Sequence, residues 1–386
     1  MKTIRSRGLY ADINSDINSN FTELGQFGKQ ANMYQSLQRI PSFFKGLNTF
    51  TAYDRFVFGS YTDVHQYFTR LMGFQRFVNI ISSYVKCNIV QGDIIGESNT
   101  KANALSICQG FAKLTLGFDV DTLLCIGNHD INAYYGDSVN LVLSKQEQRD
   151  NILNLAMAKT ENTVFPSTSV CYYYKDYVTS SYKIRVIVLD QYETPETSTG
   201  GIYEYTMYQS KHYSNTQLNW LCNTALNLPD SDYHVILVNH EGLSSPSTYN
   251  DSYLVLKEII DAFAIQGTVS MSDNINNFEY NVVEDFSSIN GFNGNFVMCL
   301  YGHIHEPDVS KITINGRQYN NIRTIATGKV YGYNKYENTG TEESASILIV
   351  DTMLKRIFIL RYGNPCDFNG NGLPFGDYGI DVEITY

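Results

Sequence analysis

Asp, Asn and His side chains follow several apolar segments of this 386-residue sequence, and their types and spacing suit metal binding. They form five short motifs: Asp63-Val64-His65, Gly92-Asp93, Gly127-Asn128-His129-Asp130, Asn239-His240 and Gly302-His303-Ile304-His305. Neutral imidazole and carboxylate are ligands that Zn, Mn and Fe share, so these side chains would form a transition-metal site if they converged. The motifs therefore predict a metal centre.

The number of candidate ligands favours two metals over one. Seven ligands exceed what a single tetrahedral centre takes, and a carboxylate on a central strand could bridge a pair of cations. In Asp63-x-His65 and His303-x-His305, alternate residues project to the same side of an extended segment. Each pair can therefore present two ligands to one place.

The segments that position these motifs alternate between strand and helix patterns. Strands are predicted over 55–60, 87–93 and 121–130, with amphipathic helices over 65–85 and 100–117 between them. This β-α-β-α-β order implies parallel strands covered by helices. Ligands usually bind where parallel strands end, which is where the motifs lie.

The second half of the sequence repeats this alternation and then changes to paired strands. Further strands are predicted over 169–178, 182–190, 233–241 and 295–307, with helices over 214–228, beginning at an N-cap Ser214 or Asn215, and over 252–264. Asn315-Gly316 predicts a hairpin within 311–328, and two more paired strands are predicted over 344–363. The long Tyr-rich loop 191–213 is expected to cover a site or to be disordered.

The motif order D-x-H, G-D, G-N-H-D, N-H, G-H-x-H resembles the calcineurin-like metallophosphoesterase family. The resemblance implies an α/β fold, namely an α/β/β/α sandwich of two mixed sheets flanked by helices, over residues 51–362. It also implies that Asp63, His65 and His305 hold one metal, that Asn128, His240 and His303 hold the other, and that Asp93 bridges them. His129 would lie near the leaving oxygen of the substrate, and Asp130 would orient its ring.

The activity implied by this resemblance is hydrolysis of a phosphodiester or phosphomonoester by a dinuclear metal-dependent phosphohydrolase. A hydroxide bridging the two metals would be the nucleophile, attacking phosphorus in line without a covalent phosphoenzyme. The cofactors would be two divalent or trivalent transition-metal ions, with Mn, Fe and Zn the first candidates. The sequence after Gly92-Asp93 is Ile-Ile-Gly-Glu, unlike the D-R-G of protein Ser/Thr phosphatases. It also lacks the tyrosine ligand of purple acid phosphatases.

Composition limits the other functions open to the chain. Its formal charge of −11, from 28 Lys+Arg and 39 Asp+Glu, disfavours a protein whose main partner is nucleic acid, although a nuclease stays an alternative. A hydrophobic content of 43% excludes a disordered chain. No apolar stretch is long enough to span a membrane, and the N-terminus lacks the apolar part of an export signal, so a soluble, cytoplasmic protein is expected.

The two ends of the chain lie outside the family resemblance. Residues 1–50 are predicted to be an appendage, helical or involved in assembly, and residues 363–386 a loop-rich tail. The Asn-rich start is similar to segments of phage tail proteins, so a second hypothesis is a virion component that carries an accessory or idle phosphoesterase module and oligomerises through residues 1–50. The seven cysteines are expected to be thiols, and Tyr residues 203–213 are expected to pack rather than to line a pocket.

Overall fold

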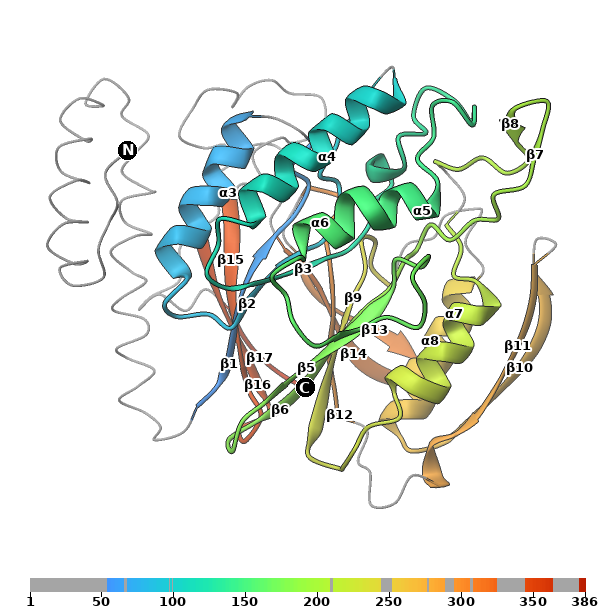
Figure 1. The fold of residues 1–386 in the computed structure, drawn as a ribbon. Helices are drawn as coiled ribbons and strands as arrows, with labels where there is room; N and C mark the ends of the chain where they lie inside the picture. Colours follow the sequence, from blue (N-terminus) through green and yellow to red (C-terminus); the bar gives the residue numbers. More distant parts are fainter. Residues whose placement is uncertain are drawn as a thin grey trace, which may run out of the picture.

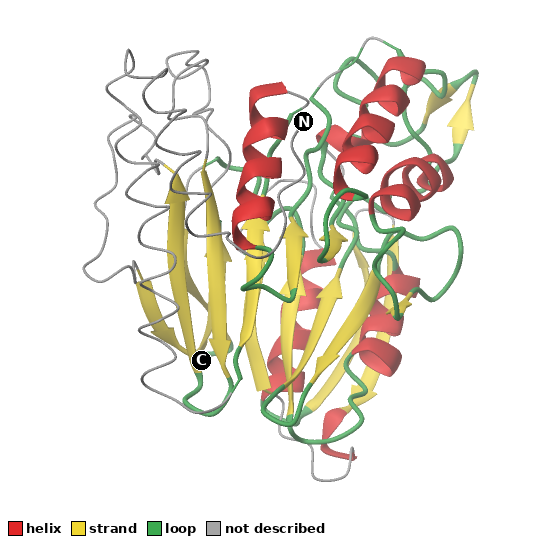
Figure 2. Ribbon diagram, turned by 60° about the vertical axis from the view of Figure 1, so that its left-hand side comes forward, coloured by secondary structure: helices red, strands yellow, loops and turns green. Residues whose placement is uncertain are grey.

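Two mixed β-sheets form the centre of the molecule, and helices cover their outer faces (Figures 1 and 2). The computed structural model describes residues 54–65, 68–96, 98, 100–208, 211–243, 252–275, 278–288, 295–305, 308–324, 344–363 and 382–386. Within these residues, the predicted α/β/β/α sandwich is confirmed. The appendage over residues 1–50 and its proposed role in assembly lie outside the described residues.

The first sheet has six strands in the order β17-β16-β15-β1-β2-β3. Its parallel strands are β1 (Phe56–Tyr61), β2 (Cys87–Val90) and β3 (Asp121–Leu124), and its antiparallel strands are β15 (Ser344–Asp351), β16 (Arg356–Gly363) and β17 (Val382–Thr385). Helices α3 (Phe68–Ile81) and α4 (Lys101–Thr115) connect the parallel strands. The predicted β-α-β-α-β unit is therefore present.

The second sheet has seven strands in the order β13-β14-β12-β9-β6-β5-β4. Its strands are β4 (Thr163–Val164), β5 (Tyr173–Val178), β6 (Lys183–Val188), β9 (Tyr233–Val238), β12 (Asn295–Tyr301), β13 (Asp308–Ile314) and β14 (Arg317–Arg323). Strands β6, β9, β12 and β14 run parallel. The β13–β14 turn is formed by Asn315 (φ 49°) and Gly316 (φ 82°), as the predicted hairpin requires.

One apolar core fills the space between the sheets, and a second lies under the helices of the second sheet. The inner core includes Phe58 and Leu348 from the first sheet and Ile236 from the second. Helices α7 (Asn215–Trp220) and α8 (Ser252–Ala264) bury Leu218 and Phe263 in the outer core. Burying each such side chain stabilises the fold by about 1.5–3 kcal/mol, which keeps the strand ends in fixed positions.

Local capping explains where two of the predicted helices begin. The Thr100 hydroxyl accepts a hydrogen bond from the Asn103 N–H at the start of α4, and the Ser214 hydroxyl accepts one from the Gln217 N–H at the start of α7. The second pair identifies Ser214 as the N-cap. The predicted helix over 214–228 is shorter as an α-helix, because a π-helical turn follows α7 over Leu221–Ala225.

Some elements differ from the sequence-based expectations. A protruding hairpin, β10 (Thr268–Ile275) and β11 (Phe278–Asp285), was not predicted. The tail over 363–386 supplies β17, which pairs with β16, so its last residues are part of the sheet. Short helices α5 (Lys145–Gln148) and α6 (Asn154–Ala156) and the small hairpin β7 (Ser198–Thr199) and β8 (Ile202–Tyr203) lie in the middle region.

Strand β3 is the last strand of its sheet, and side-chain hydroxyls occupy its outer backbone groups. The Thr160 hydroxyl accepts from the Thr122 N–H and donates to the Thr122 carbonyl, each at 3.0 Å. The Tyr173 hydroxyl accepts from the Leu124 N–H at 2.7 Å and donates to the Leu124 carbonyl at 3.0 Å. Both residues are thus hydrogen-bonded on the side facing away from β2.

The described helices include none that is long and apolar enough to cross a membrane. The six cysteines in the described residues are free thiols and are buried, in agreement with the expectation for them, whereas Cys366 lies outside the described residues.

Candidate metal centre

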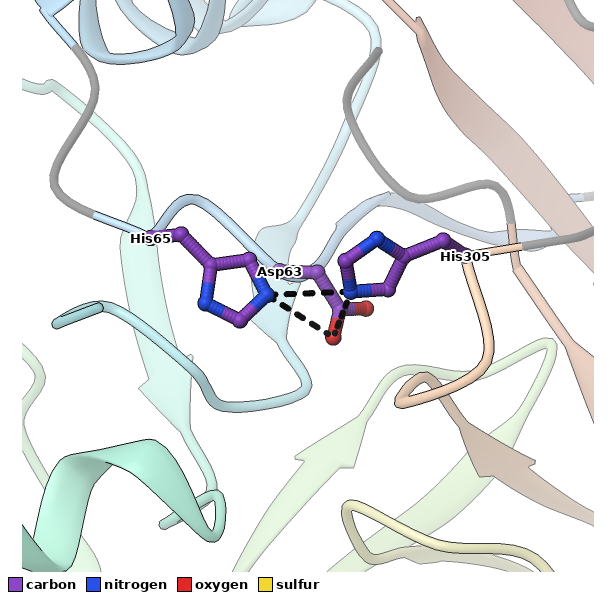
Figure 3. A group of neighbouring side chains, drawn as sticks. All are labelled: Asp63, His65 and His305. Carbon is purple, nitrogen blue, oxygen red and sulfur yellow. Dashed lines mark hydrogen bonds and ion pairs between the residues drawn. The ribbon is translucent and has the colours of Figure 1, made fainter. Parts of the chain in front are cut away.

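The structure brings the Asp63-x-His65 and Gly302-His303-Ile304-His305 motifs together although they come from different sheets. Figure 3 shows Asp63, His65 and His305 pointing toward one another. The Nε2 atoms of His65 and His305 are 3.0 Å apart, and Oδ1 of Asp63 lies 3.3 Å from Nε2 of His305 and 3.8 Å from Nε2 of His65. These three residues form one group of converging potential ligands.

Asn128, His240 and His303 converge beside this group. Oδ1 of Asn128 lies 3.0 Å from Nε2 of His240 and 3.1 Å from Nδ1 of His303. The other ring nitrogen of His240, Nδ1, is 2.6 Å from the Gln91 carbonyl. Because a carbonyl oxygen only accepts, Nδ1 carries the proton in this bond, which orients Nε2 of His240 toward Asn128.

Asp93 lies between the two groups. Its Oδ2 atom is 3.1 Å from Nε2 of His240, 3.8 Å from Nε2 of His65 and 3.9 Å from Nε2 of His129. Its Oδ1 atom accepts a hydrogen bond of 2.9 Å from the His129 N–H, which fixes the carboxylate. This is the position that a bridging ligand needs, although coordination by each of the seven predicted ligands stays a prediction.

The backbone at five of these residues has the left-handed conformation. The φ angles are 57° at Asp63, 48° at His65, 55° at Asp93, 72° at His303 and 61° at His305. These are five of the ten non-glycine residues with positive φ in the described part of the chain. Such a conformation is costly for L-residues and is found preferentially at functional sites, where surrounding structure enforces it.

Two motif glycines are required by close packing of the turns. A Cβ on Gly127 would lie 2.2 Å from Oδ1 of Asp93, and a Cβ on Gly302 would lie 2.0 Å from the Thr62 hydroxyl and 2.9 Å from Oδ2 of Asp63. Any side chain at either position would push a candidate ligand aside. The glycines of G-N-H-D and G-H-x-H are therefore part of the geometry of the site.

The carboxylates of Asp63 and Asp93 are almost fully buried and lie next to imidazole rings. Asp63 and Asp93 are 0% and 1% exposed. Burial opposes their charged forms, but His305 and His240 hold the pKa of Asp63 below its usual range, and His240 and His129 do the same for Asp93. Burial alone would lower the pKa of His240, yet the charge of Asp93 raises it to about 10.

The donor atoms fit bound metal ions in type and in spacing. Ligands at about 2.0–2.2 Å from a metal ion must be roughly 3.0–3.6 Å from one another, as simple geometry requires. Two separations in the first group, 3.0 and 3.3 Å, and those in the second, 3.0, 3.1 and 3.1 Å, lie in this range, whereas Oδ1 of Asp63 and Nε2 of His65 are slightly farther apart at 3.8 Å. The raised pKa of His240 means that its ring holds a proton among the buried carboxylates, and a metal ion bound there would take the place of that proton.

Asp130 has partners that differ from the predicted ones. Its buried carboxylate accepts hydrogen bonds from four backbone N–H groups, those of Asp93, Ile94, Ile95 and Gly127. Burial and then the charge of Asp93 raise its pKa to about 7. These bonds tie the G-N-H-D turn to the G-D turn. Orientation of the His129 ring by Asp130 stays a prediction.

Three contacts at the site had no assigned role from the sequence. Glu241, which follows His240, has Oε1 at 3.8 Å from Nε2 of His303 and accepts a 2.6 Å hydrogen bond from the Tyr192 hydroxyl and another from Lys211. The Gln91 carbonyl orients His240. The Tyr208 hydroxyl lies 3.2 Å from Nε2 of His129. Two of these residues carried a sequence signal. Glu241 adjoins a motif histidine, and Tyr208 lies in the loop 191–213, which was expected to cover a site or to be disordered.

The Tyr-rich segment has more than one function in the structure. Tyr213 is fully buried and its hydroxyl accepts from Asn239, as the packing interpretation expects, whereas Tyr208 contacts His129. His212 and His234, which were given no role, are buried and bonded to the hydroxyls of Tyr280 and Tyr386.

Comparison with protein families supports the assignment of this site. The model of the calcineurin-like phosphoesterase family matches residues 57–307, which is well over half of the chain and includes every candidate ligand. Among curated protein sequences, none matches this chain.

A search of solved structures also found matches at low sequence identity. One is a conserved uncharacterized protein, a predicted phosphoesterase, from Streptococcus pneumoniae TIGR4 (10% identity, 87% of this chain and 100% of that chain covered, TM-score 0.30). Another is GAP50, the anchor in the inner membrane complex of Plasmodium (11% identity, 85% and 90% covered, TM-score 0.43). A third is a protein of Thermus thermophilus (9% identity, 79% and 98% covered, TM-score 0.34).

Proposed function

Because the chain belongs to the calcineurin-like phosphoesterase family, and is thus a metal-dependent phosphoester hydrolase, we propose that it uses two metal ions to hydrolyse a small phosphomonoester or phosphodiester. The observation that carries this proposal is the position of Asp93. Its Oδ2 atom faces His65 of one ligand group and His240 of the other. A carboxylate in that position can serve two cations at once.

In this proposal, Asp63, His65 and His305 would hold one ion and Asn128, His240 and His303 would hold the other, with Asp93 available to both. Such a pair of ions, when bound, supplies Lewis acidity toward the phosphoryl oxygen and lowers the pKa of water toward 7. Mn, Fe and Zn all suit this ligand set. Hydroxide formed from that water would attack phosphorus in line with the leaving oxygen, so that no residue of the chain would need to be phosphorylated.

His129 is the proposed general acid. Its backbone N–H donates a hydrogen bond to Oδ1 of Asp93. Its Nε2 atom lies 3.9 Å from Oδ2 of Asp93 and 3.2 Å from the Tyr208 hydroxyl. The ring is therefore beside the ligand groups, where it can donate a proton to the departing alkoxide. A general acid of this kind contributes about 10²–10⁴-fold to the rate.

Metal titration combined with a phosphoester assay tests the proposal. Metal-free protein titrated with Mn²⁺ should bind two ions and then hydrolyse p-nitrophenyl phosphate or bis-p-nitrophenyl phosphate. His305→Ala and His240→Ala should each bind one ion fewer, because each removes a ligand from a different group. A protein that binds no Mn²⁺ and turns over neither ester would contradict the proposal.

A His129→Gln variant separates catalysis from metal binding. It should bind two Mn²⁺ ions, as the wild type does, while kcat falls by about 10²–10⁴-fold. The measurement is the metal content of the purified variant beside its steady-state kinetics. Loss of the metal ions in this variant would show that His129 is itself a ligand.

A further inference from the structure

Three tyrosines form an aromatic surface next to His129, which we call the tyrosine shelf: Tyr134, Tyr135 and Tyr208. The ring of Tyr134 meets those of Tyr135 and Tyr208 edge to face, with centroids 5.1 and 5.4 Å apart. These spacings are typical of interacting aromatic pairs. The three side chains therefore support one another as a continuous apolar surface.

The tyrosine shelf touches the proposed general acid directly. The Tyr208 hydroxyl lies 3.2 Å from Nε2 of His129, and the Tyr208 ring meets the His129 ring edge to face at 5.5 Å. The Tyr134 ring is nearly parallel to the His129 ring, at 18° and 6.3 Å between centroids. Nε2 of His129 also lies 3.9 Å from Oδ2 of Asp93, so only the His129 ring separates the candidate metal centre from the shelf. An organic group joined to a phosphate at the centre would therefore lie within reach of the shelf.

Among the aromatic residues whose burial the structure describes, Tyr134 and Tyr135 are the most exposed. Tyr134 and Tyr135 are 55% and 59% exposed, whereas Tyr172, Tyr173 and Tyr192 are at most 1% exposed. Two tyrosine rings are thus accessible to solvent beside the candidate metal centre. Aromatic rings that line a site with a few polar groups are a common means of binding the organic part of a ligand.

We propose that the tyrosine shelf binds a planar ring carried by the leaving group, so that the substrates are phosphoesters of alcohols that bear a planar ring, such as a nucleoside or an aryl alcohol. This proposal rests on the proposed hydrolase function. Tyrosine offers a ring face and edge without a competing charge, so it favours the organic group and leaves phosphate to the metal centre.

Binding of two matched phosphonates to the Mn²⁺-loaded protein tests the shelf without requiring turnover. Benzylphosphonate and cyclohexylmethylphosphonate differ in whether the ring is planar, and simple apolar contact would favour the larger saturated ring. Titration calorimetry should show benzylphosphonate binding about 2- to 10-fold more tightly, the range expected for an aromatic pair.

Variants locate this preference at the shelf. Tyr134→Leu/Tyr135→Leu should abolish the preference, and Tyr134→Phe/Tyr135→Phe should keep it, because the rings remain. Tyr386→Leu is the matched control. Tyr386 is bonded to His234 at the start of strand β9, and the metal centre lies at the other end of that strand. Equal binding of the two phosphonates, no binding of either, or a preference that survives the Leu changes would overturn the proposal.

Turnover measured in parallel distinguishes failure of the shelf from failure of the hydrolase function. If benzyl phosphate and cyclohexylmethyl phosphate are hydrolysed with equal kcat/KM, the chain is a hydrolase without an aromatic site. If neither is hydrolysed but the phosphonate preference is present and depends on the rings, the shelf stands and the proposed activity fails.

Discussion

The two edges of the sheets hold charged side chains in different ways. At the edge where β1, β2, β9 and β12 end, Asp63 and Asp93 are buried among histidines. At the opposite edge, where β9 and β12 begin, a cavity of about 350 Å³ is lined by residues that include Lys183, Asp232 and Lys355. There, Lys183 pairs with Asp230 at 2.8 Å and with Asp232 at 3.3 Å, and the two aspartates are 43% and 74% exposed.

This contrast illustrates why buried charge is a better indication of a candidate functional site than the volume of a cavity. Exposed ion pairs such as those of Lys183 are solvated and contribute little to stability. Buried carboxylates and imidazoles with shifted pKa values are costly to a fold, and such groups gather at functional sites. The left-handed backbone at five candidate ligands adds to that cost at the metal centre, whereas Lys355 alone among the residues lining the opposite cavity has a positive φ.

The largest expected effect comes from removing the carboxylate at the centre of the reactive edge. Asp93→Ala should lose the second of two bound Mn²⁺ ions and reduce phosphoester hydrolysis by more than the roughly 10⁴-fold upper range for a lost general acid. The metal-free protein should also become less stable, because the change removes the buried carboxylate that pairs with His240 and accepts from the backbone N–H of His129. Metal analysis, kinetics and denaturant unfolding check this, and an active variant would remove the distinction between the edges.

A smaller effect is expected from the residue that contacts a candidate ligand from outside. Glu241→Gln keeps the shape but weakens the attraction between Glu241 and Nε2 of His303. Loss of such an outer partner typically weakens metal binding by about 10–100-fold. Calorimetric titration with Mn²⁺ measures this, with Asp232→Asn at the opposite edge as the matched control. Equal affinity of the two variants would show that Glu241 does not support the centre.

Acid should destabilise both edges through two buried histidines. Burial lowers the pKa of His212 and of His234 to about 4 in the folded protein, below the unfolded value of about 6.5. The unfolded chain therefore takes up protons first, so the stabilising contribution is complete above about pH 6.5 and is lost as pH falls toward 4. The expected loss is on the order of 2 kcal/mol for each histidine.

Urea unfolding at several pH values, with EDTA present, measures this acid effect separately from metal binding. His212→Phe and His234→Phe should each reduce the fall in the free energy of unfolding between pH 7 and pH 4.5, because each removes one group that titrates. An unchanged pH dependence in both variants would assign acid sensitivity to other residues.

The smallest effect is expected at the exposed ion pairs of the opposite edge. Lys183→Ala removes both bonds to Asp230 and Asp232. Metal content and activity should stay as in the wild type, since these pairs lie at the start of the strands whose other ends bear the ligands. Kinetics of the purified variant provide the check, and a large fall in kcat would mean that the two edges communicate.

Local sequence predicted most elements because apolar periodicity and turn chemistry act over a few residues. The strands β2, β9 and β12 and the helix α8 lie within their predicted segments, β1 extends one residue beyond its own, and Asn315-Gly316 forms the predicted turn. The β10–β11 hairpin was missed because it contains many polar residues and packs on α7 and α8 rather than in the central sheets. Strand β17 was missed because its pairing with β16 connects distant parts of the chain.

At the site, the residue types and their order predicted which side chains gather, but not how their neighbours hold them. Three of the four amides that bind Asp130 belong to the turn after β2, more than 30 residues earlier in the chain. The fourth, that of Gly127, belongs to the turn that contains Asp130. The contacts of Tyr208 with His129 and of Glu241 with His303 likewise join separate segments. Such partners are determined by tertiary packing, which no local pattern records.

The hydroxyl groups along β3 have a consequence for how the protein behaves at high concentration. An outermost strand with open amides and carbonyls is a template on which another chain can add a strand, the first step of aggregation. Thr160 and Tyr173 occupy these groups at Thr122 and Leu124. The margin of the sheet nearest the G-N-H-D turn is thereby closed to foreign strands, and copies of the protein can crowd together without joining along it.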